Sequence, residues 1–101
     1  MQRLATIISL MSLLTAMPAF AADIESGRRI AQQRCASCHV VIPNQRAEVA
    51  DSPPFATIAQ KHGFDADAIA AMVLAPHPRM NLMLRPSEAL DIAAYIAALP
   101  R

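Results

Sequence analysis

The chain has few aromatic residues, few glycines and little net charge. Among its 101 residues there are three Phe, one Tyr, no Trp and two Gly. Nine Lys and Arg stand against eight Asp and Glu, so the formal net charge is only +1. Nucleic-acid binding usually shows as clustered basic residues, and no basic run is present, so we expect no nucleic-acid partner. No segment alternates apolar and polar residues as a strand would, and the pattern therefore predicts an all-α fold.

A hydrophobic run long enough to cross a membrane is also missing. Such a run needs about 20 apolar residues, whereas residues 4–16 form a shorter stretch interrupted by Ser and Thr. Arg3 precedes this stretch, and Ala19 and Ala21 place small residues where signal peptidase reads them. We predict that residues 1–21 are a cleaved secretory signal peptide and that residues 22–101 form one domain in the periplasm. An uncleaved N-terminal anchor is the alternative.

Cysteine is scarce, and both copies fall in one short motif. Cys35 and Cys38 are separated by two residues, and His39 follows directly, which gives the C-x-x-C-H pattern of c-type haem attachment. The two thiols can add to the vinyl groups of one porphyrin, and the histidine can then bind its iron. We predict one covalently bound haem c at Cys35 and Cys38, with His39 as an iron ligand.

Two other readings of this motif are a disulfide and a zinc site. An exported protein with an even cysteine count often has a disulfide. A bridge over so short a loop would stabilise the fold little, and no strand signal precedes Cys35 as it does in thioredoxin-like proteins. Zinc would need further ligands, and only one histidine is adjacent.

Hydrophobic periodicity and capping signals predict four helices in the rest of the chain. Gly27 lies inside the first of them, where it suits a close crossing by another helix; a tolerated surface glycine is the alternative. Met72 is expected in the buried face of the third. Proline and asparagine mark loops over 40–54 and 75–85. The expected helices cover residues 24–36, 55–62, 65–74 and 86–99.

Taken together, these features resemble a small class I cytochrome c. A helix with a glycine leads into C-x-x-C-H, a proline-rich loop follows, a methionine stands in a proline-containing loop, and the last helix carries Asp-Ile-Ala-Ala-Tyr-Ile. The resemblance implies three to five helices around a covalently bound haem. It also implies that the N- and C-terminal helices cross, with Gly27 and Tyr95 meeting near the crossing.

The resemblance implies iron ligation by one histidine and one methionine. His39 takes the proximal position, and its other ring nitrogen is expected to meet a proline carbonyl, for which Pro53 is favoured over Pro54. Met80, in the Pro-Arg-Met segment before the last helix, matches the distal methionine, with Met83 as the alternative.

Other residues of the distal segment leave further possibilities. His77 could be the sixth ligand, or the sixth position could be open. Arg79 or Arg85 could pair with a haem propionate, or could simply face solvent.

The function implied by the resemblance is that of a periplasmic one-electron carrier rather than an enzyme. Its partners would be redox proteins in the periplasm or at the membrane surface, and it would act as a monomer or as a subunit of a complex. The alternatives are a permanently bound cytochrome subunit of a dehydrogenase, a gas-binding haem sensor and a thiol–disulfide enzyme.

Overall fold

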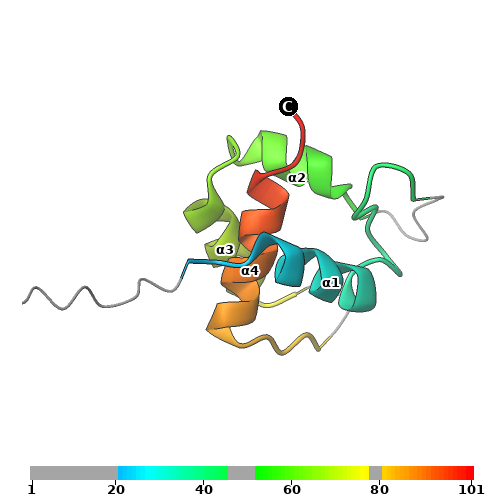
Figure 1. Ribbon diagram of the computed structural model, residues 1–101. Helices are drawn as coiled ribbons and strands as arrows, with labels where there is room; N and C mark the ends of the chain where they lie inside the picture. The colour runs from blue at the N-terminus through cyan, green and yellow to red at the C-terminus, as the bar shows by residue number, and fades with distance from the viewer. Residues whose placement is uncertain (1–20, 46–51, 78–80) are drawn as a thin grey trace, which may run out of the picture.

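The computed structural model describes residues 21–45, 52–77 and 81–101, and these residues form four helices and no strand. The expected signal peptide up to residue 20, together with Arg79 and Met80, lies outside the described residues. The all-α fold is confirmed. The first, second and fourth helices end one or two residues earlier than expected, a difference that is common at helix ends. The helices are α1 (Ile24–Arg34), α2 (Phe55–Lys61), α3 (Ala66–Leu74) and α4 (Pro86–Ala97) (Figure 1).

Acidic side chains fix where three of the helices begin. The Asp23 carboxylate accepts from the Ser26 backbone N–H at the start of α1, and Asp65 does the same for Asp67 and Ala68 at the start of α3. Arg85 is a poor N-cap residue, and the start of α4 is instead stabilised by Glu88, whose Oε1 accepts from the Arg85 N–H at 3.0 Å. This bond, followed by the contact with the Arg85 guanidinium, lowers the pKa of Glu88.

Helix α4 is the centre of the hydrophobic core. It packs mainly against α1 and α3 and less extensively against α2. Its Tyr95 is buried, and the phenol O–H donates to the Val41 carbonyl, which attaches the loop after α1 to this helix. The buried core residues of α4 are Ala89, Ile92, Ala93, Tyr95 and Ile96.

Helices α1 and α4 cross (Figure 1), and Gly27 lies where their backbones meet. A Cβ at this position would overlap the carbonyl carbon and oxygen of Asp91 and would lie 2.9 Å from the Ile92 nitrogen. Beside this contact, the Asp23 N–H donates to the Asp91 carboxylate at 2.8 Å. Gly27 therefore meets α4 one turn before Tyr95 rather than at Tyr95 itself.

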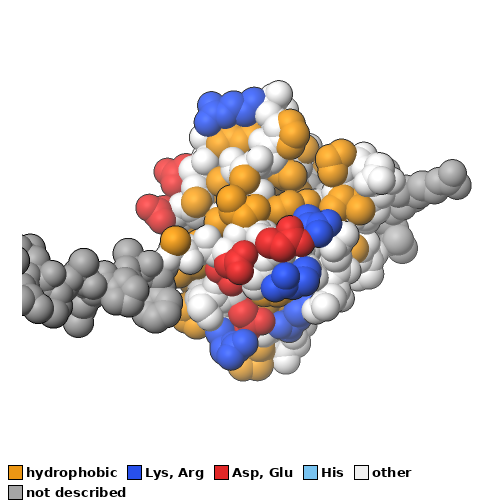
Figure 2. Space-filling model, in the orientation of Figure 1, with side chains coloured by type: hydrophobic (Ala, Val, Ile, Leu, Met, Phe, Trp, Pro, Cys, Tyr) orange, Lys and Arg blue, Asp and Glu red, His pale blue; other side chains and the backbone are white. Residues whose placement is uncertain are grey.

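The charges on the surface are mixed in sign. Where α1 lies at the front of the molecule, acidic and basic side chains are interspersed (Figure 2). Arg28 and Glu25 form an ion pair on this helix, with a shortest distance of 2.5 Å. No helix among the described residues is long and apolar enough to cross a membrane.

We predict that Gly27→Ala strongly destabilises the protein. The added methyl meets α4 backbone, which cannot rotate away as a side chain can. The free energy of unfolding of the haem-loaded protein, measured by urea denaturation, is expected to fall by about 3 kcal/mol, the upper end of overpacking costs.

Gly63→Ala is the matched control. Gly63 has φ +61°, and a Cβ there meets nothing within 4 Å, so only the left-handed backbone should cost stability, by about 1 kcal/mol. Equal losses in the two variants would contradict the account of the helix crossing.

Candidate functional site

The C-x-x-C-H motif forms a tight turn that continues directly from α1. Cys35 caps the helix, with its N–H bonded to the Ala31 carbonyl. The Cys35 carbonyl then accepts from the N–H groups of both Cys38 (3.1 Å) and His39 (2.9 Å). This turn brings the two cysteines and the histidine together although the helix has ended.

The imidazole of His39 is held by the chain that precedes α2. Its Nδ1 lies 2.6 Å from the Pro53 carbonyl oxygen. Because a carbonyl can only accept, Nδ1 carries the proton of this bond, and Nε2 is the ring nitrogen left to bind a metal. The Pro54 carbonyl accepts instead from Ile58 in the first turn of α2. Of the two prolines considered, the geometry therefore places Pro53 beside His39.

Gln45 stabilises the loop that carries His39, a role that the sequence did not predict. Its side-chain amide donates to the carbonyls of Ala36 (3.1 Å) and His39 (2.8 Å). Its Oε1 accepts from the N–H of Val41 at 2.9 Å. A single polar residue in a loop gives no sequence signal for such a role.

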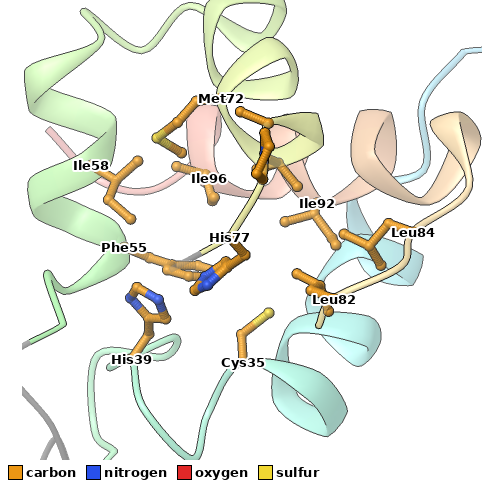
Figure 3. Close-up of a pocket in the computed structure, with 13 residues that line it drawn as sticks. Cys35, His39, Phe55, Ile58, Met72, His77, Leu82, Leu84, Ile92 and Ile96 are labelled. Carbon is orange, nitrogen blue, oxygen red and sulfur yellow. The ribbon is translucent and has the colours of Figure 1, made fainter. Parts of the chain in front are cut away.

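An apolar cavity of about 250 Å³ opens beside the motif (Figure 3). One buried water needs only about 10–15 Å³ of such space, so the cavity is far larger than a packing defect. Cys35 and His39 lie at its edge, and residues of all the helices except α1 line the remainder. A flat apolar group tethered to the thiols fits this lining better than a polar substrate. The lining residues outside the motif include Phe55, Ile58, Met72, Leu82, Leu84, Ile92 and Ile96.

Cys35 and Cys38 are not bridged to each other in the structure. Burial raises the pKa of the Cys35 thiol. A redox-active C-x-x-C pair needs a cysteine with a lowered pKa, because the thiolate is the nucleophile. The environment of Cys35 therefore disfavours a thiol–disulfide enzyme.

Described residues between α3 and α4 also line the cavity, on both sides of the gap at 78–80. Leu82 and Leu84 line the cavity, whereas the Met83 side chain is directed outward and is 77% exposed. This alternation is typical of extended backbone. The Met83 carbonyl accepts from the Arg34 guanidinium at 3.2 Å, which fastens the segment to the end of α1. Met80, the favoured distal ligand, lies outside the described residues.

Two expectations about neighbouring side chains need correction or refinement. Met72 was expected in the core, but it lines the cavity and is 36% exposed. A helical apolar stripe does not distinguish a face turned to a core from one turned to a ligand cavity. Arg85, a candidate partner for a propionate, is largely exposed and pairs with Glu88 at 3.2 Å. Arg79 lies outside the described residues.

Comparison with known proteins gives one informative match. The chain is 45% identical over 82 residues to the protein named cytochrome c-552 of Bradyrhizobium diazoefficiens, which covers 80% of this chain and 79% of that protein. The chain belongs to the class I c-type cytochromes. No family model and no solved structure matches it.

Membership of this family confirms the expected cofactor. The cytochrome carries haem c, joined covalently to Cys35 and Cys38, and it is a haem-containing electron carrier. Redox proteins are accordingly its partners. The axial ligands and the compartment stay predictions.

We predict that Gln45→Ala loosens the haem-binding loop of this cytochrome. The substitution leaves the N–H of the buried Val41 without its acceptor, which costs about 1–3 kcal/mol of stability. In hydrogen exchange of the haem-loaded protein, the Val41 amide should exchange faster than in the wild type.

Gln60→Ala is the matched control, because Gln60 is exposed on α2. It should change the free energy of unfolding by no more than about 0.5 kcal/mol. The exchange rate of the Val41 amide should stay the same. If both glutamine variants behave alike, Gln45 does not hold the loop.

Proposed function

We propose that this cytochrome is an exported one-electron carrier whose haem iron is bound by His39 and Met80. The observation that carries the proposal is the position of His39. Its ring is fixed by the Pro53 carbonyl at the edge of an apolar cavity, beside the cysteines of the haem motif. The haem supplies the one-electron chemistry, and the chain supplies the iron ligands and an apolar environment.

The hydrogen bond to Pro53 prepares His39 for metal binding. An imidazole must be neutral to bind a metal through one nitrogen, and a hydrogen bond from the other nitrogen fixes both its tautomer and its orientation. Two residues after Pro53, the Phe55 N–H donates to the Val40 carbonyl at 3.0 Å, which attaches the start of α2 to the residue after His39. The acceptor and the ligand therefore belong to one connected loop structure.

The described methionines support Met80 as the distal ligand. Met83 faces solvent, and its backbone is fastened by Arg34, so the segment would have to turn over to bring the thioether inward. Met72 lines the cavity from α3, where a thioether also packs well as an apolar group. A methionine opposite a histidine raises the reduction potential of haem iron.

An iron bound by the protein on both sides suits electron transfer rather than catalysis. Because the cavity walls are mostly aliphatic and aromatic, little polar surface has to rearrange when the charge of the iron changes. We propose that this protein, cleaved after Ala21, works in the periplasm and meets its redox partners there or at the membrane surface. Such contacts are brief and bury a small area.

Replacing three methionines separately by leucine tests the ligand assignment. Leucine has a similar volume and no sulfur, so the packing changes little. We predict that Met80→Leu abolishes the weak sulfur-to-iron absorption band of the ferric protein, whereas Met83→Leu and Met72→Leu keep it.

The haem content of each variant is measured as its pyridine haemochrome, so that loss of haem is not mistaken for loss of a ligand. A Met80→Leu spectrum that retains the band would show that another residue holds the iron.

A further inference from the structure

The cavity contains a second imidazole that the proposed ligand pair does not use. His77 lines the cavity together with His39, and both rings also border the smaller hollow beside Cys38. The two ring centroids lie 6.1 Å apart, and the ring planes cross at 88°. Figure 3 shows both imidazoles at the same end of the cavity, near Cys35.

This separation matches that of two imidazoles on one metal ion. Metal–imidazole bonds are about 2 Å long, so rings on opposite sides of a shared iron have centroids about 6 Å apart. The two axial rings can adopt any mutual rotation about the metal–nitrogen axis, and 88° is compatible with this arrangement. A porphyrin bound at Cys35 and Cys38 next to His39 therefore has His77 within reach of its other face.

The backbone around His77 supports this placement. Helix α3 ends at Leu74, and Ala75 turns the chain to an extended conformation with φ −66° and ψ 156°. Pro76 then has its φ restricted by its ring. Because α3 packs on α4, His77 follows a fixed helix by only a few residues. His62, by comparison, ends α2 and does not line the cavity.

We propose that His77 is a reserve distal ligand, which binds the iron opposite His39 when no methionine holds it. The proposal rests on the proposed function, because it takes His39 as the proximal ligand. Thioethers are readily oxidised to sulfoxides, and an exported methionine ligand is exposed to this risk. If the methionine is lost, His77 takes its place on the iron. The reduction potential then falls, but the sixth position stays filled and small ligands stay excluded.

The test removes the candidate methionine ligands together. In Met80→Leu/Met83→Leu, the ferric haem is expected to be low-spin without the sulfur-to-iron band. Adding His77→Ala is expected to make it high-spin. If His77 holds the iron in nine-tenths of the molecules, carbon monoxide should bind the ferrous double variant about tenfold more weakly than the triple variant.

Adding His62→Ala instead of His77→Ala is the matched control and should leave the spectrum and the carbon monoxide affinity of the double variant unchanged. A high-spin double variant, or equal carbon monoxide affinities with and without His77, would overturn the proposal. A sulfur-to-iron band that persists in the double variant would overturn it as well, and would also contradict Met80 as the ligand.

Two results together support both proposals. Met80→Leu lacks the sulfur-to-iron band, and the double variant is low-spin but becomes high-spin when His77→Ala is added. Should the double variant not accumulate, Met80→Leu is compared with Met80→Leu/His77→Ala. The same difference in spin state is expected, and its absence would overturn the role of His77.

Discussion

The arrangement of the whole domain depends on the contact between the backbones of α1 and α4 at Gly27. Because no Cβ separates the helices, Gly27 lies directly against Asp91 and Ile92, and the end of α1 is placed at a fixed point beside the last helix. The haem motif begins where α1 ends. The crossing therefore decides where the two thiols and His39 lie relative to the apolar face of α4.

From this fixed point, hydrogen bonds rather than regular structure carry the motif to its place. Gln45 binds the carbonyls of the turn, Pro53 orients His39, and Tyr95 fastens Val41 to α4. His39, which these bonds help to position, lies at the edge of the cavity, whose walls are largely apolar. The protein thus keeps its polar groups paired where the ligand is attached and offers apolar contacts to the face of the porphyrin.

The sequence predicted the parts of this protein whose signals are local. The motif around Cys35 is read from five consecutive residues, and the helices follow from periodicity and from caps such as Asp65. The choice of Pro53 over Pro54 needed the fold, because only the structure shows that the Pro54 carbonyl is used by α2. Gln45 acts through hydrogen bonds within a folded loop, and no sequence pattern predicts its partners.

Periodicity failed for Met72 because it reports that a face is apolar and not what covers it. The most direct test of the central claim, a haem held by two thioethers on an exported chain, is the intact mass of protein produced with a working cytochrome maturation apparatus. The account predicts the mass of residues 22–101 plus one haem. A polypeptide mass without haem would contradict it.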